Sequence, residues 1–278
     1  MARIRSRQTL LGVLFMGAAV VALVFLVLPV VAIFTRVSPG HLVRLLSNPV
    51  VTDALVVSLK TTAIAQALIL LFGTPLAYLL ASRRFRGRTL LVTVVELPLV
   101  LPPAVAGLGL LAAFGRFGLL GSTDRALGID VAFTQTAVVL AVAFVASPLY
   151  IRTAIAAFEA VDADLVAASR TLGAGSTRTF FRVVLPLTRD GLAAGEALAF
   201  ARGLGEFGAT IMFAGSLQGV TQTLPLAIYA AFSLNFDVAL AMGALLVVVS
   251  AVLLLTLRLI LSWQPSRRTS RSLVAPSS

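Results

Sequence analysis

Residues able to carry out chemistry are scarce in this chain, and their spacing excludes the common catalytic and metal sites. The 278 residues include no cysteine and a single histidine, His41, so neither a thiolate site nor a histidine cluster is available to a metal ion. The only lysine, Lys60, lies in V-V-S-L-K-T-T, which lacks the glycines of the phosphate-binding loop G-x-x-x-x-G-K-[ST]. We therefore expect no catalytic residue, no metal and no bound cofactor in this chain.

A cluster of both acidic and basic residues lies in residues 158–188, a polar stretch between two apolar runs. Its acids come early and its bases come late. Two interpretations fit this pattern equally: an amphipathic linker that lies on a membrane surface, or a helix that docks onto a partner protein. The charged residues of the stretch are Glu159, Asp162, Asp164, Arg170, Arg178 and Arg182.

We expect two short helices within this stretch, because about 30 residues at a rise of 1.5 Å per residue leave room for both. Asp162 is placed to cap a first helix that begins at Ala163, where the helix dipole favours an acid. Gly173 and Gly175 are expected to end that helix. A second helix is predicted over residues 177–185, ending before a proline.

Charged residues also interrupt otherwise apolar runs, and four of them are candidates for a pathway or an internal ion pair. A charge in such a run is costly unless it faces water or the protein interior. Arg202 and Glu206 are four residues apart, so a continuous helix would place them on one face, able to pair and to line or brace a pathway. For Glu196 a structural ion pair between helices is the favoured interpretation. The fourth of these residues is Lys60.

Neutral hydrogen-bond donors in the same runs suit an anion that must be held weakly enough to leave. Their alternative role is helix packing, with each hydroxyl or amide satisfied inside the protein. The lack of an arginine cluster is compatible with a pathway that leaves capture of the anion to a separate external protein. The residues expected to line a pathway or gate are Arg202, Glu206, Thr210, Thr61, Thr62 and Gln66.

These groups must be positioned by membrane-spanning helices. The chain is 59% hydrophobic and 12% charged, with a mean hydropathy of +1.03, and its apolar runs exceed the length of about 18 residues that indicates a span. We predict an all-α membrane protein with one six-span domain over residues 10–262. Pro75 should kink the second span, and the prolines of L-P-L-V-L-P-P (97–103) should break the third. The predicted spans cover residues 10–34, 52–81, 89–113, 134–157, 191–214 and 238–262.

The distribution of Lys and Arg predicts the orientation of the spans. Sixteen of the 22 lie on the side of both termini and of residues 158–188, and four lie on the other side. Because cytoplasmic loops are enriched in these residues, both termini and residues 158–188 are expected in the cytoplasm. The same enrichment accounts for the net charge of +11 without a nucleic-acid partner. Residues 1–9 form a basic tail, and residues 263–278 form a basic, Ser-rich tail that we expect to be disordered.

Within the polar stretch, one pattern resembles the EAA loop of ABC importer permeases: Glu-Ala-Ala, three residues, Gly, nine residues, Ile-x-Leu-Pro. Gly173 fits, and Val183-Val184-Leu185-Pro186 follows after nine residues. Ala167 replaces the glutamate of the pattern. In the family this cytoplasmic loop forms helices that dock into a groove of the ATP-hydrolysing subunit. Here the corresponding residues are Asp162, Asp164, Ala167, Ala168, Ser169, Arg170, Thr171, Leu172, Gly173 and Ala174.

Longer motifs narrow the resemblance to the molybdate subgroup of these permeases. They include S-R-T-L-G-A (169–174), L-A-F-A-R-G-L-G-E-F-G-A-T (198–210) and T-Q-T-L-P-L-A-I-Y (221–229). Ser216 stands where the subgroup has asparagine after Ala-Gly. The resemblance implies a type I importer permease in a bacterial inner membrane. It also implies a second copy of the chain, two ATPase subunits that bind ATP and Mg²⁺, and an external oxyanion-binding protein.

Other functions remain open at this point. Sulfate and tungstate permeases are close relatives of the molybdate subgroup. A self-sufficient secondary transporter or channel is less well supported, because the spans show neither an inverted repeat nor a carboxylate-rich relay. A structural membrane scaffold is the third class, and it would tolerate a bulky residue in place of Gly173.

Overall fold

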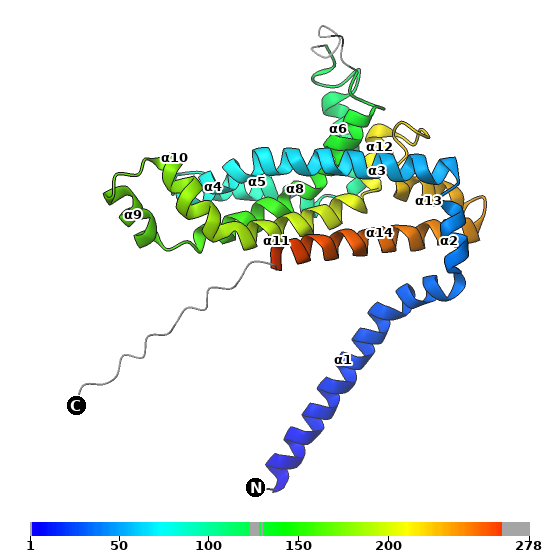
Figure 1. The fold of residues 1–278 in the computed structure, drawn as a ribbon, viewed down its shortest axis with the longest axis horizontal. Coiled ribbons are helices and arrows are strands. Elements are labelled where there is room, and N and C mark those ends of the chain that lie inside the picture. Colours follow the sequence, from blue (N-terminus) through cyan, green and yellow to red (C-terminus); the bar gives the residue numbers. More distant parts are fainter. Residues whose placement is uncertain (1, 123–127, 129, 263–278) are drawn as a thin grey trace. The chain divides into compact units, whose positions relative to one another are not determined.

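Helices make up all the regular structure in the part of the chain that is described. The computed structural model describes residues 2–122, 128 and 130–262 (Figure 1). The all-α prediction is therefore confirmed for these residues. The tail at 263–278, for which we predict disorder, lies outside them. The predicted basic tail at 1–9 is helical from residue 2 onward, because α1 covers Ala2–Arg36.

Four helices are long and apolar enough to cross a membrane. They are Gly12–Arg36, Pro49–Ser82, Gln135–Glu159 and Phe236–Thr256, and they coincide with the first, second, fourth and sixth predicted spans. A fifth candidate is a broken pair, α5 (Arg88–Val100) and α6 (Pro103–Phe114), at the place of the third. Leu101 and Pro102 between them are extended, with ψ values of 133°. The predicted break at the prolines is thus confirmed.

The fifth predicted span differs from the prediction. Residues 191–214 were expected to form one helix, but α11 (Leu185–Leu204) ends and α12 (Gly208–Ala214) begins after a three-residue break. Within α11, Arg189, Asp190, Glu196 and Arg202 lower the hydropathy, so the helix is not among those apolar enough to span. The segment between the fifth and sixth predicted spans also contains a helix, α13 (Leu224–Phe232).

Two prolines are accommodated by wide helical turns. The second span consists of α3 (Pro49–Leu68), a π-helical turn η1 (Ile69–Gly73) and α4 (Thr74–Ser82). Pro75 and Pro186 each lie two residues after a π-helical turn, η1 and η2 (Phe180–Val184) respectively. A proline has no N–H for the carbonyl four residues earlier and its ring crowds that carbonyl, and a wider turn relieves the conflict. At Pro75, where a kink is expected, the helix widens locally into a π-helical turn.

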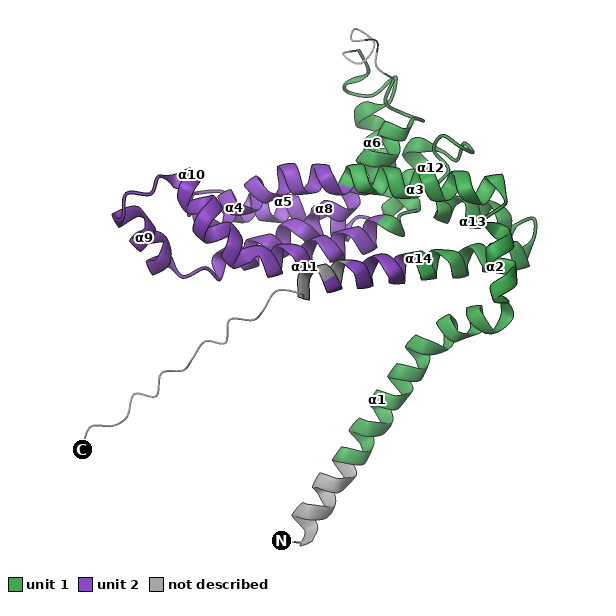
Figure 2. Ribbon diagram, in the orientation of Figure 1, with its two compact units in different colours: residues 1–65, 102–142, 204–249 green, residues 66–101, 143–203, 250–278 purple. Residues whose placement is uncertain are grey.

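The chain divides into two compact units, which we describe separately (Figure 2). The first comprises residues 1–65, 102–142 and 204–249. Its core joins α3 to α13 and α14 (Phe236–Ser262) through Val51, Leu224 and Met242, all at most 1% exposed. The hydroxyl of Ser58 accepts a hydrogen bond from the Leu224 backbone N–H at 2.7 Å, which seats the start of α13 on α3.

The second unit comprises residues 66–101, 143–203 and 250–278. Its core is centred on Tyr150 in α8 (Gln135–Glu159), which is fully buried and shares a 2.5 Å hydrogen bond with the hydroxyl of Thr74. Glycines allow α11 to approach α8 closely: a Cβ on Gly191 would lie 2.5 Å from the Cβ of Ala157. This unit contains the polar stretch at 158–188.

Candidate functional site

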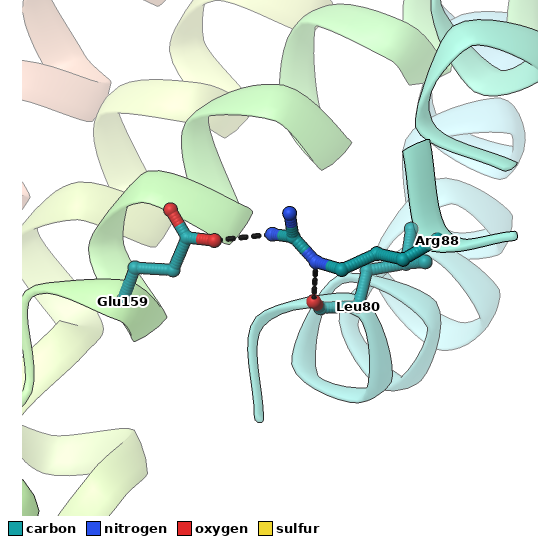
Figure 3. Close-up of polar contacts among 3 residues, drawn as sticks. All are labelled: Leu80, Arg88 and Glu159. Atoms are coloured by element: carbon teal, nitrogen blue, oxygen red, sulfur yellow. Dashed lines mark hydrogen bonds and ion pairs between the residues drawn. The ribbon is translucent and has the colours of Figure 1, made fainter. Parts of the chain in front are cut away.

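The polar stretch begins at an ion pair that ties it to a neighbouring helix. Glu159, the last residue of α8, pairs with the guanidinium of Arg88, the first residue of α5 (Figure 3). The Nε of Arg88 also donates a hydrogen bond to the carbonyl of Leu80 at 2.6 Å. One guanidinium therefore connects α4, α5 and α8 where the stretch leaves α8.

Three aromatic rings hold the two ends of the stretch together. Tyr78 of α4 packs edge-on against Phe158 and Phe180, with ring centroids 5.4 Å and 4.8 Å away. Phe158 is at the end of α8, and Phe180 begins the π-helical turn η2 near the end of the stretch. Edge-to-face pairs of this kind add about 0.5–1.5 kcal/mol each beyond the area they bury. The stretch is thus attached firmly at its entry and its exit.

The first helix of the stretch has the predicted bounds and caps. α9 covers Ala163–Thr171, and the Asp162 carboxylate accepts a hydrogen bond from the Asp164 N–H at 2.9 Å. At its end Gly173 has φ +84°, with bonds from Gly173 N to the Arg170 carbonyl and from Ala174 N to the Ser169 carbonyl. These two hydrogen bonds form the Schellman motif. The motif uses a glycine at this position because the left-handed backbone conformation strains other residues.

The second helix of the stretch does not end where the sequence predicts. α10 (Ser176–Thr179) starts close to the predicted residue 177, but it continues through η2 into α11 without a break. The prediction of a helix ending before Pro186 is therefore wrong, because the π-helical turn lets the proline enter the first turn of α11. The hydroxyls of Ser169 and Thr179 lie 3.1 Å apart and connect α9 to α10.

α9 is held in place but presents most of its surface to the outside. None of its residues is buried, and Leu165 is 47% exposed; Leu172, the residue that follows the helix, is 87% exposed. Ala167 and Ala168, on the EAA pattern, are also exposed. The exposed leucines lie beside Asp164 and Arg170, so α9 and its C-terminal end present a mixed apolar and charged surface.

The neutral residues expected to line a pathway on α3 are buried within the chain. Thr61, Thr62 and Gln66 are 0%, 2% and 5% exposed. The hydroxyl of Thr61 donates to the Val57 carbonyl of its own helix at 2.6 Å, as a packing hydroxyl would. Both polar atoms of the Gln66 amide are buried without a partner among the described residues, so Gln66 keeps unused hydrogen-bonding capacity.

The other pathway candidates lie around the break between α11 and α12. Arg202 is in α11, whereas Glu206 falls in the break, so the predicted shared helix face does not exist. Glu206 is 2% exposed, and its Oε1 accepts a hydrogen bond from the Ala209 N–H at 2.7 Å, which caps α12. Thr210 is fully buried, and its hydroxyl has no partner among the described residues.

The small residues of G-L-G-E-F-G-A-T serve close packing in the first unit. A Cβ on Gly208 would lie 2.7 Å from the Cβ of Pro103, at the start of α6. A Cβ on Gly107 would lie 2.5 Å from the Ala209 carbonyl oxygen and 2.9 Å from its Cα. α6 and α12 are therefore in backbone contact, as small residues allow in membrane proteins.

Two groups of residues that hold the stretch were not found from the sequence. The Arg88–Glu159 pair joins residues 71 positions apart, and Tyr78 contacts rings contributed by distant segments. No local spacing indicates either contact. Covariation between the positions of Arg88 and Glu159 would be the signal that could reveal the pair.

The fold of the described residues is shared with solved membrane transporters. A solved structure of a bacterial ABC transporter that imports the acidic polysaccharide alginate has the same fold, with a TM-score of 0.71. The likeness covers 92% of this chain and 96% of that chain at 17% sequence identity, and therefore concerns the fold alone.

The sequence places the chain more closely. It belongs to the family of binding-protein-dependent transport system inner membrane components, whose model matches residues 73–268. The molybdenum transport system permease protein ModB of Mycobacterium tuberculosis is 46% identical over 85% of this chain and 90% of that protein. ModB of Escherichia coli is 47% identical over 64% of this chain and 78% of that protein. The resemblance to importer permeases is thereby confirmed.

Proposed function

We propose that this chain is the membrane-spanning permease subunit of an ATP-driven importer that carries molybdate into the cytoplasm. The observation that carries the proposal is the 46% identity to a molybdenum transport permease over 90% of that protein's length. Identity at this level over nearly a whole protein supports the same architecture and the same class of cargo. Tungstate and sulfate are the alternative cargoes.

The proposed arrangement has six spans and both termini in the cytoplasm. α11 together with α12 would form the fifth of these six spans, with its charges facing the protein rather than lipid. The excess of Lys and Arg on one side supports this orientation. It places α9 in the cytoplasm, where an ATPase subunit can reach it.

Energy for transport must then come from a separate subunit, because Lys60 is the chain's only lysine and has no phosphate-binding loop around it. We propose that two ATPase subunits, which bind ATP and Mg²⁺, each receive α9 of one permease copy. A second copy of this chain would complete the pathway and cover part of α1. No part of the apolar segment 12–36 of α1 is buried within the chain. An external protein would deliver the anion.

α9 is suited to transmit motion because it is fixed at both ends. The Arg88–Glu159 pair and the Tyr78 rings tie the stretch to α4, α5 and α8, so a displacement of α9 by the ATPase would move these helices with it. Rigid attachment of this kind is what alternating access between an outward-open and an inward-open pathway requires.

Reconstitution in liposomes tests the proposal. The purified permease, its ATPase and the external binding protein should hydrolyse ATP faster when molybdate is supplied, and should accumulate molybdate inside. ATP hydrolysis that responds to none of molybdate, tungstate and sulfate would overturn the cargo assignment. Uptake that persists without ATP and without the ATPase subunit would instead indicate a secondary transporter or channel. Competition between the three oxyanions for the binding protein would rank the cargoes.

A further inference from the structure

The chain's only lysine lies on a face of α3 that the rest of its unit leaves open. Lys60 is exposed, whereas Thr61 and Thr62, the next two residues of the helix, are buried. The exposed neighbours on this face are apolar. A charged group on an apolar membrane-length helix is costly in contact with lipid, so it is expected to face water or another protein surface. The apolar neighbours are Val56, Leu59 and Ile64, which are 61%, 37% and 42% exposed.

The ammonium group is oriented by one neutral side chain. Nζ of Lys60 donates a hydrogen bond to Oε1 of Gln135, the first residue of α8, at 2.9 Å. An ammonium can only donate, so the amide oxygen must be the acceptor and the amide nitrogen of Gln135 remains a donor. Among the described residues, neither nitrogen has a further partner. The pair therefore leaves several N–H groups and one positive charge available.

The positive charge is not neutralised by an acid of its own helix. Asp53 is the only acid in α3, and it lies seven positions before Lys60, which corresponds to about 10 Å along the helix axis. The carboxylate of Asp53 is instead within 3.4 Å of the Gln218 amide nitrogen. None of the ion pairs found among the described residues includes Lys60.

We propose that Lys60 and Gln135 form an oxyanion-receiving site at the outer mouth of the transport pathway. The inference rests on the proposed function, whose orientation places the first residue of α8 on the outer side of the membrane. A tetrahedral oxyanion offers acceptors for the ammonium and amide N–H groups together. A single lysine is a compact charge without the bidentate fork of arginine, so the anion is attracted and then released.

A labelling experiment uses the fact that the chain has one lysine. The complete complex in liposomes is treated from outside with a membrane-impermeant amine reagent, sulfosuccinimidyl acetate, and the peptide that contains residue 60 is quantified by mass spectrometry. We expect labelling of Lys60 that molybdate slows several-fold and that chloride at equal ionic strength does not slow. A lipid-facing lysine would stay unlabelled, and labelling that molybdate does not affect would show an accessible amine without an anion site. Either result would overturn the proposal.

Variants provide a second and independent measurement. Lys60→Met should lower the rate of molybdate uptake about tenfold or more, which corresponds to the loss of one hydrogen bond to a charged group. Gln135→Ala should lower it less, and Lys60→Arg should also lower it, because the bidentate guanidinium would hold the anion longer. Binding of the ATPase subunit and basal ATP hydrolysis should not change, because α9 is untouched.

The outcomes separate this site from the proposed function. A wild-type complex that imports no oxyanion would remove the proposed function itself. Wild-type uptake together with undiminished uptake by Lys60→Met would remove only the site. Reduced uptake by Lys60→Met whose residual rate keeps the wild-type molybdate dependence would show that the lysine supports the structure rather than the anion.

Discussion

Arg88 and Glu159 form an ion pair that joins the first residue of α5 to the last residue of α8. The same guanidinium binds the Leu80 carbonyl of α4, so three helices meet at one side chain (Figure 3). Glu159 is the second residue of the polar stretch. If α9 receives the ATPase as proposed, removal of this contact should affect coupling more than folding.

Replacing Glu159 by Gln tests this separation. The side chains of Arg88 and Glu159 are 30% and 48% exposed, so the loss in unfolding free energy should stay below about 1 kcal/mol. Molybdate-stimulated ATP hydrolysis should nevertheless fall several-fold in the reconstituted complex. Asp190→Asn is the control, since it removes the acid of the exposed Arg189–Asp190 pair, which holds no helix end. Equal losses of stimulation in both variants would contradict the prediction.

Replacing Gly173 by Val should detach α9 from the ATPase. The residue has φ +84° with open space around it, so the cost is backbone strain of about 1–2 kcal/mol and not a collision. That strain should unwind the end of α9, which copurification with the ATPase subunit would detect. Gly175→Ala is matched, because Gly175 has φ −67° and also faces open space. It should bind normally, and a structural scaffold would tolerate both changes.

The contact between α6 and α12 predicts a strong difference between two glycines of one helix. A Cβ at position 107 would lie 2.5 Å from the Ala209 carbonyl oxygen, whereas one at Gly109 would meet nothing within 4 Å. Gly107→Ala should therefore destabilise the protein by about 1–3 kcal/mol, since a backbone contact cannot move aside cheaply. Gly109→Ala should be neutral. The melting temperatures of the two variants in detergent measure the difference, and equal values would refute the close contact.

Several features of the fold follow from short-range signals and could be predicted from the sequence. Asp162 caps α9 and Gly173 ends it because both effects act within one helical turn. The break at Pro102 follows from the chemistry of proline in the same way. The apolar runs and the family motif predicted the membrane helices and the segment that contains α9.

Other features depend on contacts that no local pattern reveals. Pro186 does not end the second helix of the stretch, because η2 widens the turn before it. Glu206 leaves the helix of Arg202, because α11 ends at Leu204 and the carboxylate caps α12 instead. Which face of α3 packs inward is also decided by its neighbours, so Thr61 is buried while Lys60 is exposed. Tertiary packing therefore decides which polar residues remain available for a pathway.

The hydrogen bond between Ser169 and Thr179 should contribute to the rigidity of the stretch. The hydroxyl oxygens are 3.1 Å apart, and Thr179 is 1% exposed. A double-mutant cycle with Ser169→Ala and Thr179→Val should give a coupling free energy of about 0.5–1.5 kcal/mol. Thr171→Val is the control, because that hydroxyl bonds only to the Ala167 carbonyl of its own helix. A coupling free energy indistinguishable from zero would mean that this hydrogen bond does not hold α9 to α10 and that the aromatic rings fix the stretch.

Ala167, where importer permeases of this type have glutamate, offers a test of the docking surface itself. The residue is exposed on α9, so Ala167→Glu should leave the melting temperature unchanged. In the complex the new carboxylate would be desolvated in a groove that has adapted to alanine, and an unpaired buried charge is strongly unfavourable. We expect affinity for the ATPase subunit to fall about tenfold or more, measured by titration of the ATPase onto permease in nanodiscs. Ala160→Glu, also exposed but just before α9, should bind normally. Unchanged affinity of the Ala167 variant would place the docking surface on another face of α9.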